Sequence, residues 1–87
     1  MMCLLVYDIT DDRARSKVAD DCLDYGMERI QFSAFWGNLS RTYQEELIRK
    51  VKKRLGKKPG KIQLFPVCEK DVRQRLEVIQ SPPKDAP

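Results

Sequence analysis

The chain has 87 residues, of which 17 are basic, 13 are acidic and none is histidine, so its net charge is +4. This length fits one small domain with a marginal core. The missing histidine excludes Ser-His-Asp and Cys-His nucleophile pairs. Three dispersed cysteines favour neither a zinc site nor a disulfide scaffold. We therefore expect a homodimer that completes the core, and the positive charge favours a polyanionic partner.

The N-terminal apolar run, residues 1–7, is too short to cross a membrane and has no basic segment before it. We expect neither a membrane contact nor a signal peptide. The chain is expected to be a soluble, reduced, cytoplasmic protein.

The first third of the chain predicts a strand followed by a helix. Residues 1–8 are apolar up to Asp8, which is typical of a buried central strand. Thr10 or Asp11 can cap a helix whose apolar stripe covers residues 12–25. Asp8 is therefore expected where a strand leaves the core.

The middle of the chain predicts one strand, or two short strands, and then a second helix. Residues 28–37 alternate in side-chain polarity, and two short strands would meet near Ser33. Ser40 or Thr42 can open a helix that ends at Gly56.

The last third predicts three short elements. A strand is expected over residues 62–67, a helical turn over 68–73 and a final strand over 75–80. The proline-rich tail, residues 81–87, is expected to be disordered. The order predicts a single α+β domain over residues 1–80, a ferredoxin-like βαββαβ sandwich with an extra C-terminal strand.

Asp8 has two interpretations. It is either a Mg²⁺ ligand or an acid that caps a strand end, and spacing alone favours the cap. One carboxylate per chain is a poor Mg²⁺ site. A nearby two-fold axis would bring two Asp8 side chains together, and they would repel unless a cation or proton lay between them. A metal role for Asp8 therefore implies a dimer.

A basic tract runs from Arg49 to Lys61, with eight basic residues and no acid. Solvated faces usually mix signs, so we expect this tract to bind phosphates. The basic side chains of the first helix can equally form a solvated face, partly neutralised by neighbouring aspartates, and Arg29 is equally ambiguous. The candidate nucleic-acid-binding residues are Arg13, Arg15, Lys17, Lys50, Lys53, Arg54, Lys57 and Lys58.

Three segments together resemble the CRISPR-associated protein 2 family. Residues 4–15 read Leu-Leu-Val-Tyr-Asp-Ile-Thr-Asp-Asp-x-x-Arg, and residues 25–39 contain Arg-Ile-Gln-Phe-Ser-x-Phe. Residues 62–67 and 75–79 are similar to the last two strands of the family. The resemblance covers residues 1–80.

The resemblance implies a ferredoxin-like homodimer whose terminal strand, here 75–80, adds to the partner's sheet. It implies Mg²⁺ or Mn²⁺ bound through Asp8, and cleavage of single-stranded RNA or double-stranded DNA. It also implies a role in spacer acquisition, within an adaptation complex that contains the larger integrase subunit. The residues matching those that affect cleavage in the family are Tyr7, Asp8, Arg15, Lys17, Arg29, Ser33 and Phe35.

Two functions remain open at this point. The first is a metal-dependent endonuclease of CRISPR adaptation, in which Arg15, Lys17 and Arg29 could neutralise the scissile phosphate. Phe35 could then hold the bound strand by packing against it, although such aromatics are more often core or dimer contacts. The second is a non-catalytic DNA-binding scaffold with a structural Asp8. A toxin-type ribonuclease of related fold is a remoter alternative.

Overall fold

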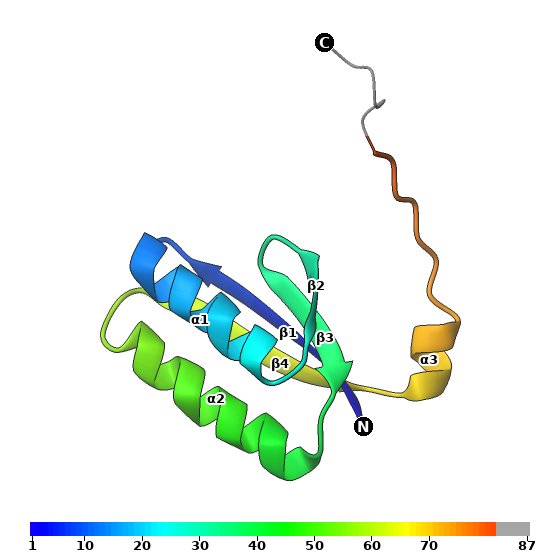
Figure 1. Ribbon diagram of the computed structural model, residues 1–87, viewed down its shortest axis with the longest axis horizontal. Coiled ribbons are helices and arrows are strands. Elements are labelled where there is room, and N and C mark those ends of the chain that lie inside the picture. Colours follow the sequence, from blue (N-terminus) through cyan, green and yellow to red (C-terminus); the bar gives the residue numbers. More distant parts are fainter. Residues whose placement is uncertain (82–87) are drawn as a thin grey trace.

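The domain is a four-stranded antiparallel sheet with two long helices on one face (Figure 1). The structure is a computed structural model that describes residues 1–81. Its elements are β1 (Met2–Ile9), α1 (Asp12–Asp24), β2 (Glu28–Gln31), β3 (Ala34–Asn38), α2 (Arg41–Leu55), β4 (Gly60–Val67) and α3 (Glu69–Arg73). The strand order is β2-β3-β1-β4, which confirms the ferredoxin-like fold class.

β1 is a central strand whose side chains alternate between the two faces of the sheet. It pairs with β3 on one side and with β4 on the other. Cys3, Leu5, Tyr7 and Ile9 are buried in the core, on the face that α1 and α2 cover. The intervening residues point to the other face, and Asp8 is the exposed member of that set. The prediction of a buried central strand is confirmed, and the strand continues one residue beyond Asp8, to Ile9.

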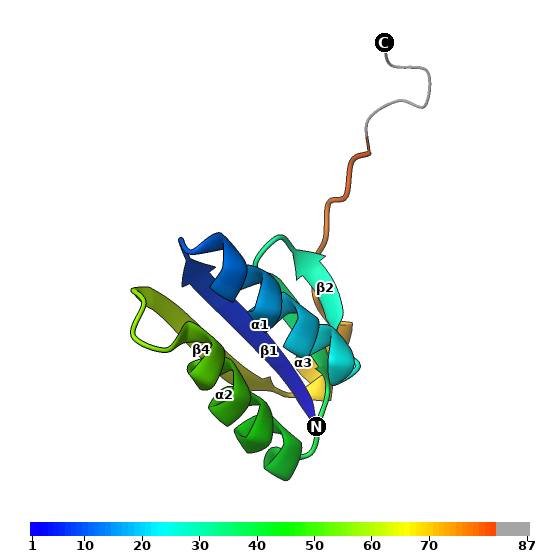
Figure 2. The same cartoon turned by 60° about the vertical axis from the view of Figure 1, so that its left-hand side comes forward.

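The two long helices lie side by side across β1 and β4 (Figure 2). Each begins at a side-chain cap, as the sequence predicts. The Asp11 carboxylate accepts a hydrogen bond from the Ala14 N–H at 2.9 Å, and Ser40 Oγ accepts one from the Tyr43 N–H at 3.1 Å. The helices contribute Ala14, Val18, Ala19, Cys22, Leu47 and Val51 to the core.

β2 and β3 form a hairpin. Residues 28–37 are therefore two short strands and not one continuous strand, which were the two possibilities that the sequence left open. The two strands are joined by a turn of two residues, Phe32 and Ser33. A bulge interrupts the β2 register between Arg29 and Gln31. Because β2 is an edge strand, this hairpin lies at one side of the sheet.

The sheet face opposite the long helices, here called the open face, carries apolar side chains. In the register of the sheet, Leu4 lies between Trp36 on β3 and Phe65 on β4, and Phe65 is 45% exposed. The short helix α3 covers only one end, where the Arg75 guanidinium lies 4.6 Å from the centre of the Trp36 ring. A small domain with an apolar open face has an incomplete core.

The prediction of a strand over residues 75–80 is wrong for the single chain. Residues 74–81 have no regular secondary structure and run away from the domain (Figure 1). Leu76, Val78 and Ile79 are 98%, 88% and 79% exposed. The segment meets neither edge of its own sheet, so it has no strand with which to form ladder hydrogen bonds.

Most of the expected disordered tail, residues 82–87, lies outside the described residues. Within residues 1–81, no helix has the length and apolar character needed to cross a bilayer.

Candidate functional site

Asp8 lies at the end of β1 on the open face. In the sheet register it pairs with Lys61 of β4, and its side chain makes no hydrogen bond or ion pair with any of the residues 1–81. Its carboxylate oxygens are therefore available to an external ligand. The described residues contain no group of three or more Cys, Asp or Glu side chains that could hold a metal ion. A metal bound by Asp8 would need donors from outside the chain.

Tyr7 points into the core, on the face opposite to Asp8. Its ring stacks on Phe35 with a centroid separation of 6.3 Å and an angle of 18° between the rings. The Arg29 guanidinium lies 5.0 Å from the centre of the Phe35 ring. Phe35 is fully buried, so the expectation that it packs against a bound nucleic-acid strand is wrong. Its burial confirms the alternative, that Phe35 is a core residue. Its ring packs against the Tyr7 ring and the Arg29 guanidinium.

Arg15 is held at the end of β1 from the helical side. Its Nη1 donates a hydrogen bond to the Ile9 carbonyl at 3.2 Å, and it forms an ion pair with Asp12. Ser33 takes part through its backbone, because its carbonyl accepts the Tyr7 N–H at 3.0 Å. The structure therefore brings Tyr7, Arg15, Arg29, Ser33 and Phe35 together and leaves Asp8 on the other face.

Phe32 is the residue at this site that sequence reasoning missed. It lies in the turn between β2 and β3 and is 70% exposed. The guanidinium of Arg15 lies 5.6 Å from the centre of its ring, and that of Arg29 lies 5.7 Å away. The alternation of residues 28–37 assigned Phe32 to a strand, which concealed its place in a two-residue turn.

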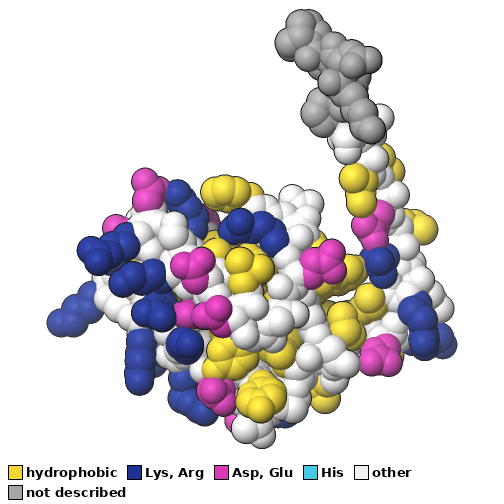
Figure 3. All heavy atoms as spheres, in the orientation of Figure 1, with side chains coloured by type: hydrophobic (Ala, Val, Ile, Leu, Met, Phe, Trp, Pro, Cys, Tyr) yellow, Lys and Arg dark blue, Asp and Glu magenta, His cyan; other side chains and the backbone are white. Residues whose placement is uncertain are grey.

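A second group of cations lies over α1 and α2, where basic side chains gather on the surface (Figure 3). Lys17 of α1 joins three residues of α2 around one hollow, which we call the basic hollow. The residues of the basic hollow are Lys17, Lys50, Lys53 and Arg54.

The buried carboxylate of Asp21 partly neutralises the basic hollow. Arg54 binds it through Nε at 2.9 Å and Nη2 at 3.2 Å, and Lys50 lies 3.7 Å from it. The sequence indicated that the basic tract presents free cations. The structure instead pairs two of them, Lys50 and Arg54, with the Asp21 carboxylate. Arg54 holds α2 against α1, because its partner is 1% exposed and belongs to the other helix.

Lys58 is also engaged, since it forms an ion pair with Asp11 at 3.1 Å. The hydrogen bond from the Ala14 N–H and the bond from Lys58 lower the pKa of the Asp11 carboxyl below its usual 3.8. The candidate cations without an ion pair to any residue from 1 to 81 are Arg13, Lys17, Arg29, Lys53 and Lys57.

Two of the three cysteines are unsuited to chemistry. Cys3 and Cys22 are buried, and burial raises the pKa of both thiols, to about 12 for Cys22. Only Cys68 is exposed. A thiolate nucleophile is therefore disfavoured at the two buried positions.

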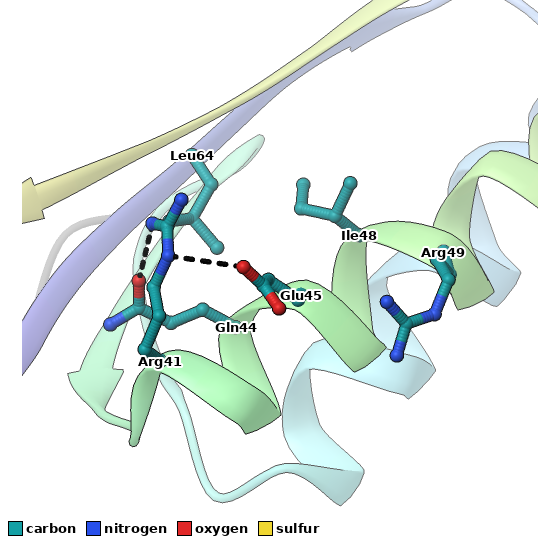
Figure 4. A pocket seen from close by; sticks show the side chains of 6 residues that line it. All are labelled: Arg41, Gln44, Glu45, Ile48, Arg49 and Leu64. Atoms are coloured by element: carbon teal, nitrogen blue, oxygen red, sulfur yellow. Dashed lines mark hydrogen bonds and ion pairs between the residues drawn. The ribbon is translucent and has the colours of Figure 1, made fainter.

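A hollow of about 410 Å³ lies beside β4 and contains none of the candidate residues (Figure 4). Arg41 lies at one end and contacts Gln44 and Glu45, each at 3.4 Å. Arg49 lies on the other side, and two apolar side chains lie between the arginines. The lining residues are Arg41, Gln44, Glu45, Ile48, Arg49 and Leu64.

Comparison with known proteins identifies the family. The model of the family described as CRISPR associated protein Cas2 matches residues 1–75 of this chain. The chain belongs to the Cas2 family. A Cas2 relative from Chloroflexus aurantiacus, named CRISPR-associated endoribonuclease Cas2 2, is 55% identical over 75% of this chain and 76% of its own length.

Two further matches bear on the fold and on partners. The crystal structure of Streptococcus pyogenes Cas2 superposes with a TM-score of 0.77, covering 92% of this chain and all of that one. Its sequence identity is 22%, so it supports the fold alone. A Thermoproteus tenax protein named CRISPR-associated endonuclease Cas1/endonuclease Cas2 fusion is 34% identical over 95% of this chain and 31% of its own length.

Proposed function

We propose that this chain is a metal-dependent endonuclease of CRISPR adaptation that acts as a homodimer on RNA or DNA. The Cas2 relatives named endoribonucleases support nuclease activity. The observation that carries the proposal is the unpartnered carboxylate of Asp8, which lies at the edge of an apolar sheet face. This arrangement would place two such carboxylates near one two-fold axis.

The open face is the proposed dimer interface. Leu4, Trp36 and Phe65 form a side of the sheet that no long helix covers. A two-fold dimer would bury the same patch of both copies, and the small core gains the most from such burial. Asp8 lies on this face, so an axis passing near the end of β1 would make two Asp8 side chains neighbours.

The C-terminal segment would extend the interface by adding to the β4 edge of the partner. Leu76 and Val78 alternate with charged residues, as a half-buried strand requires, and both are exposed in the single chain. The hollow beside β4 offers an apolar floor between Arg41 and Arg49, which could pair with Glu77.

Serine substitutions in this segment test the dimer proposal. The double variant Leu76→Ser, Val78→Ser should weaken the dimer in sedimentation experiments, because two apolar side chains no longer become buried. Leu23→Ser is the matched control, since Leu23 is 52% exposed on α1, away from the open face. A wild-type chain that is monomeric at micromolar concentration would contradict the dimer.

The donor chemistry of Asp8 fits half of a Mg²⁺ or Mn²⁺ site. Mg²⁺ is commonly bound by one or two carboxylates, with water and phosphate completing its six ligands. Two facing carboxylates repel each other, so a cation between them is favoured. When bound, the ion would polarise a phosphate and lower the pKa of a coordinated water.

The chain's own cations would bind the nucleic acid at the same end of β1, from the side of the sheet that the helices cover. Arg15 and Arg29 can donate paired hydrogen bonds to phosphate oxygens and stabilise charge that develops during cleavage. Lys17 and Lys53 in the basic hollow would contact the backbone farther along the ligand. These contacts fix its path without selecting a sequence.

Asp8→Asn is the test of the proposed activity. The amide keeps the size of the side chain and removes its charge. Cleavage of labelled RNA and DNA with Mg²⁺ or Mn²⁺ should be lost, whereas binding in EDTA should persist because it depends on the cations. Without metal, the variant dimer should be at least as stable as the wild type, since the carboxylate repulsion is gone.

A structural cap at Asp8 predicts another pattern. The variant would lose about 0.5–2 kcal/mol of stability with or without metal, and its cleavage would fall only in proportion to the folded fraction. Melting curves recorded with and without Mg²⁺, beside the cleavage assay, distinguish these outcomes.

The second candidate function is a DNA-binding scaffold that joins an integrase partner. The fused Thermoproteus tenax relative supports it, because its name places Cas1 and Cas2 in one chain. This function predicts binding to duplex DNA and to a Cas1 subunit, with no cleavage by the wild type under any metal condition.

A further inference from the structure

The turn between β2 and β3 presents an aromatic side chain that neither the turn nor the core requires. Two-residue hairpin turns favour Gly, Asn and Asp, yet this turn consists of Phe32 and Ser33. No residue in the described chain other than glycine has a positive φ, so the turn has no special backbone geometry for Phe32 to satisfy. With 70% of its surface exposed, Phe32 keeps most of its ring in water.

The core fixes the backbone of this turn. The Tyr7 hydroxyl donates a hydrogen bond to the Phe32 carbonyl at 3.4 Å, and the Tyr7 N–H donates one to the Ser33 carbonyl at 3.0 Å. Tyr7 itself is buried and stacks on Phe35. The exposed ring therefore stands on an anchored turn, which lowers the entropy lost when a ligand binds it.

Two cations lie close to the ring. Arg15 and Arg29 each lie within 6 Å of its centre, a distance at which a guanidinium and an aromatic ring attract one another. Arg29 has no carboxylate partner among residues 1–81, and the partner of Arg15, Asp12, is itself exposed. An anchored and exposed aromatic ring with two arginines beside it offers a stacking surface and two phosphate donors at one place.

We propose that Phe32 is the stacking platform for an unpaired nucleobase, with Arg15 and Arg29 binding the adjacent phosphates. This inference rests on the proposed nucleic-acid function and deepens it. Bases inside a duplex are already stacked on both faces, so only a single strand or an unpaired end can use this platform. Tyr7 is then a positioning residue, since it holds the carbonyl of Phe32 rather than the ligand.

Binding of a fluorescent single-stranded 12-mer in EDTA tests the platform, with a blunt duplex and an abasic strand as comparisons. Phe32→Leu keeps an apolar side chain and removes the aromatic face. Its affinity for the single strand should fall about 5- to 140-fold, the range for one stacked base. Affinity for the duplex and for the abasic strand should stay within about two-fold of the wild type, because neither offers an unpaired base to stack.

Two further variants separate stacking from charge and from folding. Phe32→Trp should retain the wild-type affinity, because indole also stacks. Phe32→Leu should leave the salt dependence unchanged, whereas Arg29→Gln should lower its slope by about 0.7, the value for one phosphate contact with a single strand. Tyr43→Leu is the matched aromatic control, since Tyr43 is 54% exposed on α2 and contacts neither arginine of the platform.

Four results would overturn the inference. The first is equal single-strand affinity of Phe32→Leu and Tyr43→Leu, and the second is a loss of duplex affinity in Phe32→Leu as large as its loss for the single strand. The third is a loss in Phe32→Trp as large as in Phe32→Leu, and the fourth is a change of oligomeric state in Phe32→Leu. The last would make Phe32 a protein contact. A wild-type protein that binds none of the three ligands would instead refute the proposed nucleic-acid function, and with it the platform.

Discussion

Replacing Arg54 by glutamine is expected to destabilise the fold more than it weakens nucleic-acid binding. The sequence places Arg54 in a basic tract, but the structure shows it bound to Asp21 by two hydrogen bonds, at 2.9 and 3.2 Å. The carboxylate is 1% exposed, so it cannot recover solvation when its partner is removed. Lys50 remains 3.7 Å away and compensates only in part.

The expected loss of stability follows from the exposure of the Arg54 and Asp21 side chains. Removing one partner of a fully buried pair costs about 3–5 kcal/mol. The Arg54 side chain is 37% exposed, so solvent screens the pair and we discount this to about 1–2 kcal/mol. For a domain of this size, each kcal/mol lowers the melting temperature by about 4–8 °C. Arg54→Gln should therefore melt about 5–15 °C below the wild type.

Lys53→Gln is the matched control for this prediction. Lys53 lies in the same basic hollow, carries the same charge and has no ion pair with residues 1–81. Its removal should leave the melting temperature almost unchanged and lower the salt slope of duplex binding by about 0.9. Thermal melts beside binding isotherms at several salt concentrations compare the two variants. If both melt alike and lose affinity alike, Arg54 is a nucleic-acid contact and the structural account of the ion pair is refuted.

Three shorter predictions follow from the same geometry. In the native protein, a thiol reagent should modify Cys68 quickly and the two buried cysteines only after unfolding, which mass spectrometry can count. The folded pKa of Asp11 lies below its usual value, so its contacts contribute their full stability above the usual pKa and lose it as the pH falls through the folded pKa. Asp11→Asn should therefore flatten the acid limb of stability against pH. Because Lys58 is paired and Lys57 is not, Lys57→Gln should lower the salt slope of duplex binding more than Lys58→Gln does.

Local sequence rules predicted most of the fold. The apolar run of β1, the cap at Asp11, the stop at Gly56 and the division near Ser33 all involve residues close together in the chain. The terminal segment could not be assigned in the same way. Its alternation is that of a strand, but a strand also needs a neighbouring edge, and the single chain does not place one beside it.

The candidate site was harder to predict because its contacts cross the sheet and join distant segments. Asp21 and Arg54 are 33 positions apart, so a cation count along the chain could not show that they neutralise one another. Alternation in β1 does imply that Asp8 and Tyr7 face opposite ways, but the family motif joins them as one site. Burial likewise separates Phe35 from Phe32, although both are aromatic residues of one hairpin.

The number of metal ions bound per chain tests the central proposal most directly, because one chain supplies only half of the Asp8 site. Titration with Mn²⁺, followed by electron paramagnetic resonance of the free ion, should give one tightly bound ion per two wild-type chains. Asp8→Asn should bind none at that site. One ion per chain, or the same binding in Asp8→Asn, would contradict a metal site shared between two Asp8 carboxylates.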